Sequence, residues 1–170
     1  MESTNENNEN NENTNETKTI EELIETLKSD DEFVQEEARM FLEMRKDESL
    51  EPMIEALKTN KNKDVKISLG KVLGFIGDPL AIPVLIDTLS DMNKLVRREA
   101  STALIKMGTP AVDPLIAILS DDDWKVRGAA AWALGGIGDK KALKPLENLL
   151  NDDSGFVKAG VKNSIAKLNE

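Results

Sequence analysis

The nonpolar residues of this 170-residue chain follow a helical spacing that recurs every 30 or 31 residues. Each period contains a valine, and the residues four and eight positions after it are also nonpolar. The five valines are Val34, Val65, Val96, Val126 and Val157. Spacings of zero, four and eight place side chains along one side of an α-helix. Because a second nonpolar pair precedes each valine, the pattern predicts two helices per period.

Residues typical of helix starts and helix ends mark the limits of these predicted helices. Asp78 and Thr109 each precede a proline, which favours a helix start, and Gly77 and Gly138 follow the last nonpolar residue of a helix. We expect the first helices near residues 19–28, 48–58, 79–90, 110–119 and 140–150, and the second helices near 32–45, 63–76, 93–107, 123–137 and 154–168.

A pair of helices this short cannot bury its own nonpolar side, so neighbouring pairs must stack on one another. We therefore predict an all-α fold, an α-α superhelix (solenoid) of five helix-pair repeats spanning residues 19–170. The repeats cover about 19–47, 48–77, 78–108, 109–138 and 139–170. Residues 1–18 are rich in Asn and Glu and have no nonpolar residue after Met1. We predict that they form a disordered tail.

The composition restricts the chemistry that this chain can perform. It has 22 basic and 32 acidic residues, a net charge of -10, no Cys and no His. Without thiols or imidazoles, the usual nucleophilic triads and most transition-metal sites are excluded. We therefore predict no catalytic residues and no cofactor, and a protein that is not an enzyme. The negative charge disfavours nucleic acid and anionic membranes as partners.

No targeting segment is visible in the sequence. The first residues lack the nonpolar core of a signal peptide, and the longest nonpolar run, residues 129–138, is too short to span a membrane. We expect a cytoplasmic protein without a membrane anchor.

Asp121, Asp122 and Asp123 form a run of carboxylates that could bind Ca²⁺ or Mg²⁺. The run lacks the alternating ligands and the terminal Glu of a calcium loop, and it leads directly into a predicted helix. Carboxylates before a helix stabilise its N-terminus without a metal. We therefore interpret the run as a helix cap and predict no metal site.

Two consecutive segments carry a family resemblance: AIPVLIDTLSDMNKLVRREASTALIKMG at 81–108 and AVDPLIAILSDDDWKVRGAAAWALGGIG at 111–138. They resemble HEAT-like repeats of the phycobilin (PBS) lyase type, and the resemblance extends over residues 19–168. It implies a right-handed superhelix whose second helices line a concave surface that binds other proteins. It also implies a hydrogen-bonded ladder between repeats, built from an acidic residue six positions before a basic one. The corresponding pairs are Asp91 with Arg97, Asp121 with Arg127, and Asp152 with Lys158.

The side of each second helix opposite the nonpolar stripe is the predicted concave binding surface. Its residues are Ile67, Lys71, Gly74, Arg98, Thr102, Ile105, Gly128, Ala131, Trp132 and Gly135. Trp132 stands among residues too small to cover it, as in interaction hot spots. It could instead pack against a neighbouring repeat, and the sequence leaves both arrangements open.

The sequence therefore favours a non-catalytic protein–protein interaction scaffold that binds another protein or peptide, as a monomer or weak homo-oligomer. The alternative is an accessory or lyase-type protein related to phycobilin lyases. The resemblance also extends to deoxyhypusine hydroxylases, but their His-containing metal site cannot be built from this chain. Nucleic-acid binding, as in HEAT-like DNA glycosylases, is disfavoured by the net charge of -10.

Overall fold

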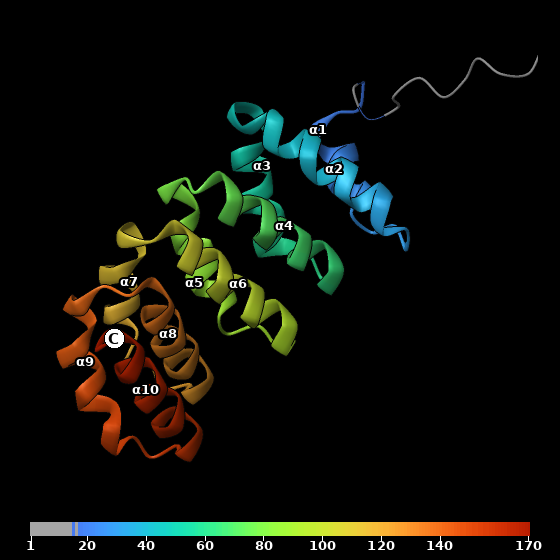
Figure 1. The fold of residues 1–170 in the computed structure, drawn as a ribbon. Helices are drawn as coiled ribbons and strands as arrows, with labels where there is room; N and C mark the ends of the chain where they lie inside the picture. The colour runs from blue at the N-terminus through green and yellow to red at the C-terminus, as the bar shows by residue number, and fades with distance from the viewer. Residues whose placement is uncertain (1–14, 16) are drawn as a thin grey trace, which may run out of the picture.

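The computed structural model describes residue 15 and residues 17–170 (Figure 1). Most of the predicted tail, residues 1–14 and 16, lies outside the described residues. Within residues 17–170 the regular structure consists of ten α-helices and four short 3-10 helices, with no β-strand. The predicted all-α superhelix of five helix pairs is confirmed. None of the helices in this described part is both long and nonpolar enough to cross a membrane.

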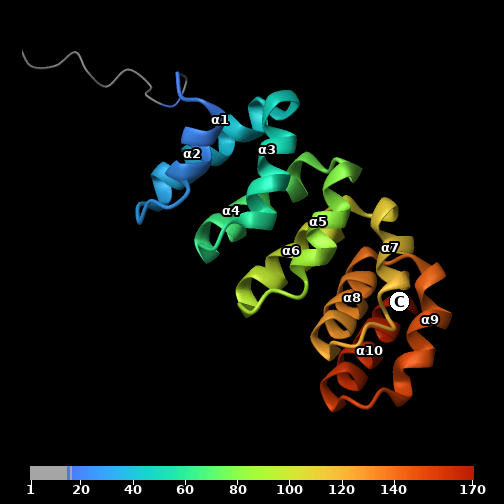
Figure 2. The same cartoon turned by 180° about the vertical axis from the view of Figure 1, so that it is seen from behind.

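The helices alternate between two layers (Figures 1 and 2). The first-helix layer contains α1 (Ile20–Thr26), α3 (Lys46–Thr59), α5 (Ile82–Thr88), α7 (Val112–Ala117) and α9 (Leu143–Asn148). The second-helix layer contains α2 (Glu32–Met44), α4 (Lys63–Ile76), α6 (Lys94–Met107), α8 (Trp124–Ile137) and α10 (Gly155–Leu168). Each pair lies beside the preceding pair along the array.

The first helices of repeats three to five are shorter than the sequence predicts. A 3-10 turn precedes each of them, at Pro79–Ala81, Thr109–Ala111 and Lys140–Ala142. Pro83 then lies in the first turn of α5. In a first turn, a proline removes no intrahelical hydrogen bond, whereas a longer helix would have to form around its missing N–H. Pro52, at the equivalent position of repeat two, lies inside the longer α3, so a proline here does not by itself fix where the first helix begins.

One continuous nonpolar core runs through all five repeats. The predicted stripe supplies much of it: Val65, Leu69 and Leu73 of α4 are completely buried. Leu85 of α5 and Leu89 at its end are also completely buried and come from the facing layer. Burying a side chain of this size contributes about 1.5–3 kcal/mol, so the stacked stripes supply most of the driving force for folding.

Neighbouring second helices approach so closely that glycine is required at the contact. A Cβ atom added to Gly74 of α4 would lie 2.7 Å from the Cα and Cβ of Ala103 in α6. A Cβ atom added to Gly135 of α8 would lie 2.5 Å from the Cβ and Oγ of Ser164 in α10. Both glycines are buried. They therefore bring the helices of consecutive repeats together.

We expect Gly135→Ala to lower the free energy of unfolding by about 1–3 kcal/mol, because α10 must shift to accommodate the new methyl group. The matched control is Gly160→Ala in α10, where an added Cβ would meet nothing within 4 Å. This control should raise stability by about 0.5–1 kcal/mol through the helix propensity of alanine. Urea unfolding followed by circular dichroism measures both effects. Two equally stable variants would contradict the close contact.

Candidate functional site

Most of the exposed side of the second-helix layer is formed by positions two, six and ten after each repeat valine, and we name this set the outer stripe; Gly128 is its one buried member. Its large nonpolar members are Met40 and Met44 on α2, Phe75 on α4 and Trp132 on α8, and each is between 41% and 71% exposed. At 100° per residue these positions lie within one narrow sector of a helix. They therefore form a surface that continues from one repeat to the next.

The structure divides the predicted concave residues into three groups. Lys71, Arg98 and Trp132 are exposed, and Ile67, Thr102 and Ile105 are half-buried. Gly74, Gly128, Ala131 and Gly135 are buried, so their prediction as surface residues is wrong. A second helix packs against its own first helix and against the second helices on both sides. A prediction based on one buried stripe overlooks these lateral contacts.

The same lateral packing shifts the exposed side of the helices toward residues that the sequence prediction missed. Phe75 and Lys106 lie ten positions after their repeat valines and are exposed. Phe33, just before α2's valine, is 78% exposed. A search for large nonpolar residues at the tenth position could have found Phe75. The same search at the position before the valine could have found Phe33, because Leu95 and Phe156 occupy that position in repeats three and five.

These missed residues line a cavity of about 700 Å³ on the second helices α2, α4 and α6. Its nonpolar lining comes from Phe33, Met40, Val72 and Phe75. The other lining residues are Glu36, Glu37, Arg39, Glu43, Lys71, Glu99, Thr102 and Lys106. A volume of this size lies in the range of about 300–1,000 Å³ that is typical of small-molecule sites.

A buried arginine organises the charges at one wall of this cavity. The Arg39 side chain is 8% exposed, and its guanidinium donates hydrogen bonds to Glu36, to Oε1 of Gln35 at 3.3 Å and to Oγ of Ser68 at 3.2 Å. The hydrogen bond and charge of Arg39 hold the pKa of Glu36 below its usual value. Arg39 is therefore already neutralised and unavailable to an anionic ligand.

Two other cations of the cavity remain available. Lys71 and Lys106 are exposed, and neither forms a hydrogen bond or an ion pair through its ammonium group with any described residue, although the charge of Lys71 contributes to lowering the pKa of Glu36. An ammonium group beside a nonpolar wall favours a ligand that combines a nonpolar body with a carboxylate.

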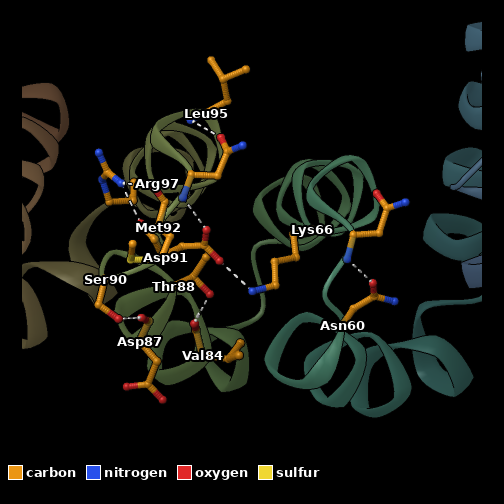
Figure 3. A network of polar contacts seen from close by, with 12 residues as sticks. Asn60, Lys66, Val84, Asp87, Thr88, Ser90, Asp91, Met92, Leu95 and Arg97 are labelled. Carbon is orange, nitrogen blue, oxygen red and sulfur yellow. Dashed lines mark hydrogen bonds and ion pairs between the residues drawn. The ribbon is translucent and has the colours of Figure 1, made fainter.

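A ladder of ion pairs joins repeat two to repeat three, where Figure 3 shows the pair of Lys66 and Asp91, and joins repeat four to repeat five. Nζ of Lys66 lies 2.6 Å from Oδ2 of Asp91 in the next repeat. Nε and Nη2 of Arg127 lie 2.7 and 2.9 Å from the two carboxylate oxygens of Asp152, also in the next repeat. Asp91 and Asp152 therefore each pair with the basic residue of the preceding repeat, whereas Asp121 of repeat four forms no such pair with Arg97 in the described part of the chain.

This arrangement corrects the predicted pairs. Arg97 does not bind the carboxylate of Asp91; its Nη1 donates to the backbone carbonyl oxygen of Asp91 at 2.6 Å. Arg127 likewise donates to the carbonyl oxygen of Asp121 at 2.8 Å. Lys158 forms no ion pair with Asp152 among the described residues. The six-residue spacing places the basic side chain over its own turn, while the carboxylate points toward the previous repeat.

The ladder shifts the pKa values of its members. The hydrogen bond from Arg127 lowers the pKa of Asp152, and the reciprocal hydrogen bond raises the pKa of Arg127. Burial acts to raise the pKa of Asp91, but hydrogen bonds from Lys66 and from the Asn93 backbone lower it overall. These carboxylates therefore favour the charged form in the folded protein.

A second cavity, of about 690 Å³, lies beside the ladder between repeats four and five. Asp121, Asp122, Asp152 and Asp153 contribute to its lining, together with Arg127. Nevertheless, no three acidic residues within the described part of the chain are arranged to hold a metal ion. The carboxylate of Asp121 instead accepts a hydrogen bond from the N–H of Asp123, which caps α8 in turn.

A family model described as HEAT repeats matches residues 50–117 and 82–166, which together make up more than half of the chain. The chain belongs to the HEAT-repeat family.

Curated relatives of this HEAT-repeat protein confirm the resemblance to phycobilin lyases. It is 33% identical over 90 residues to the bilin biosynthesis protein RpcF of Synechococcus sp., covering 52% of this chain and 43% of that protein. It is 44% identical over 68 residues to the phycocyanobilin lyase subunit alpha of Picosynechococcus sp., covering 39% of this chain and 24% of that protein. The chain thus spans less than half the length of these relatives.

A solved structure shares the fold. The complex of CpcE and CpcF of phycocyanin lyase from Nostoc sp. matches with a TM-score of 0.60 and 22% sequence identity. The match covers 85% of this chain and 96% of the chain in that structure. At this identity the similarity shows a common helical solenoid.

These relatives overturn the prediction that the protein is not an enzyme, since relatives of this HEAT-repeat protein are named as lyase subunits. That prediction rested on the absence of Cys and His. This absence removes thiolate and imidazole groups from the chain, but it does not exclude reactions whose nucleophile belongs to the substrate. It also leaves Asp, Glu, Lys and Arg available in the two cavities.

We expect Asp152→Asn to lower the free energy of unfolding at pH 7 by about 1.5–3 kcal/mol, because Arg127 loses its charged partner. Asp121→Asn is the matched control: its carboxylate forms no ion pair within the described chain, and it should change stability by less than about 0.5 kcal/mol. Urea unfolding of both variants measures the difference.

The effect of Asp152→Asn should also depend on pH. Because the folded pKa of Asp152 is lowered, its contribution is complete above the unfolded value of about 3.9 and is lost as the pH falls through the folded value. The stability difference between the wild type and Asp152→Asn should therefore shrink below about pH 4. A difference that stays constant down to complete protonation would exclude the ion pair as its source.

Proposed function

We propose that this HEAT-repeat protein is a phycobilin lyase-type protein that binds a bilin and acts together with a partner protein. The similarity to proteins named for bilin biosynthesis and phycocyanobilin lyase carries this proposal. The chain itself contains no Cys. If the bilin is joined to a thiol, that thiol belongs to the partner, and this chain holds the pigment.

The cavity on α2, α4 and α6 is the proposed bilin site. A bilin is a conjugated chain of four pyrrole-type rings that carries two propionate groups. Phe33, Met40 and Phe75 offer nonpolar contacts to such rings, and Lys71 and Lys106 offer two cations to the propionates. Phe75 is 68% exposed in this structure, so a ligand that covers its ring would remove nonpolar surface from water.

The partner is proposed to contact the second-helix layer, the surface on which the predicted scaffold function also depends. Solenoids present an extended surface that suits binding to another protein. In this proposal, binding the partner and holding the bilin are two parts of one activity. The partner must reach a bilin that is held at this surface, so both must be bound on the same layer.

We expect the purified protein to retain phycocyanobilin through gel filtration, detected as a visible absorption band that elutes with the protein. Phe75→Ala should weaken retention by about tenfold or more, since covering a phenyl ring is worth about 1.5–3 kcal/mol. Replacing Lys71 and Lys106 with Gln should weaken it as well, through loss of the charge-assisted hydrogen bonds to the propionates.

Phe156→Ala is the matched control, because Phe156 is 69% exposed but lies outside the cavity. It should retain the pigment like the wild type. The absence of a pigment band in the wild type, or equal losses in the Phe75 and Phe156 variants, would exclude this cavity as the bilin site.

A further inference from the structure

The second helices α4, α6, α8 and α10 have a charge opposite to that of the whole chain. They contain twelve Lys or Arg residues and only two acidic residues, Asp64 and Glu99, whereas the chain has a net charge of -10. The remaining helix of this layer, α2, carries four Glu and a single Arg. The second-helix layer is therefore basic from the second repeat onward, and the acidic residues lie elsewhere.

On these four helices the outer stripe has cations and no acidic residue. Its basic members are Lys71 on α4, Arg98 and Lys106 on α6, and Lys167 on α10, and all four are exposed. None of the four side chains forms an ion pair or hydrogen bond within the described part of the molecule. By contrast, Lys66 and Arg127 of the same helices are taken up by the ladder.

Trp132 continues this surface on α8, the one of these four helices whose outer stripe has no cation. It is 41% exposed and stands between Gly128 and Gly136 on the stripe, so no side chain on its own helix covers the ring. An exposed aromatic ring between cationic positions offers packing to the nonpolar parts of a bound chain.

We propose that this basic surface binds an extended acidic segment of a partner protein. Neighbouring packed helices lie about 8–10 Å apart, and an extended chain advances about 3.3 Å per residue. A segment with a carboxylate at about every third residue would therefore meet the cations of successive second helices. Its backbone would cross Trp132 between the cations of α6 and α10.

A protein segment fits this surface better than nucleic acid does. The basic region ends next to α2, the second helix that precedes α4, which carries Glu32, Glu36, Glu37 and Glu43. A long polyanion of uniform charge would meet these carboxylates and the overall negative field, whereas a short acidic segment can end before them. The binding should weaken with salt, since all four cations are exposed.

The test uses the full chain and a fluorescein-labelled peptide of repeated Glu-Asn-Asn triplets, with a Gln-Asn-Asn peptide as control. Fluorescence anisotropy at low salt should show binding of the Glu peptide and at least tenfold weaker binding of the Gln peptide. The double variant Arg98→Glu with Lys167→Glu should reduce affinity for the Glu peptide at least tenfold. Both residues lie outside the lining of the proposed bilin cavity, so bilin retention should be unchanged.

The matched control reverses two exposed lysines of the first-helix layer, Lys58→Glu with Lys144→Glu, and so changes the net charge equally. It should keep at least half of the wild-type affinity. Equal losses in the two double variants would overturn the proposal, because the effect would then come from net charge alone. Circular dichroism of each variant verifies that it folds.

Two further outcomes would assign the surface to another occupant. If single-stranded DNA of equal charge binds as tightly as the Glu peptide, the surface does not select a protein segment. Residues 2–16 of this chain contain a Glu at every third or fourth position. If removal of residues 1–14 strengthens peptide binding at least tenfold, the chain's own N-terminal segment competes for the surface, and the proposal of a partner's segment is overturned.

Discussion

The close approach of neighbouring second helices is the contact on which the rest of the structure depends. At Gly74 and Gly135 no side chain separates one helix from the next, so Ala103 and Ser164 pack directly against helix backbone. This contact joins the nonpolar stripes of separate helix pairs into one core, which no pair could form alone. It also aligns the exposed positions of successive helices. The candidate functional surface is therefore a consequence of the packing between repeats.

Charge is distributed over this framework in two distinct ways. Lys66 and Arg127 reach Asp91 and Asp152 of the following repeat and stabilise the stacking of repeats. The basic residues of the outer stripe, Arg98 among them, have no such partner in the described chain. The cations paired with a carboxylate of the next repeat thus support the fold, whereas the unpaired cations of the outer stripe are exposed and can bind an anionic ligand. The net charge of -10 conceals this separation, because it averages two layers with different compositions.

The two candidate sites, the cavity and the basic outer stripe, suit different ligands. The nonpolar cavity on α2, α4 and α6 combines Phe75 with two available lysines and suits an amphipathic pigment. The basic outer stripe extends beyond the cavity to Lys167 and suits a longer acidic partner. The proposed function requires both a pigment site and a surface for the partner. The repeats place the two candidate sites on adjacent parts of one layer.

The sequence by itself determined the number of repeats, the helical class and the buried stripe, because side chains such as Val65, Leu69 and Leu73 follow the period of one helix. It also indicated the phycobilin lyase resemblance. Only the tertiary structure decided which positions face solvent and which carboxylate pairs with which cation. Gly128 and Ala131 are buried by packing between helices, and Asp152 binds Arg127 of another repeat. Such contacts depend on how helices are placed relative to one another, which the period of a single helix does not specify.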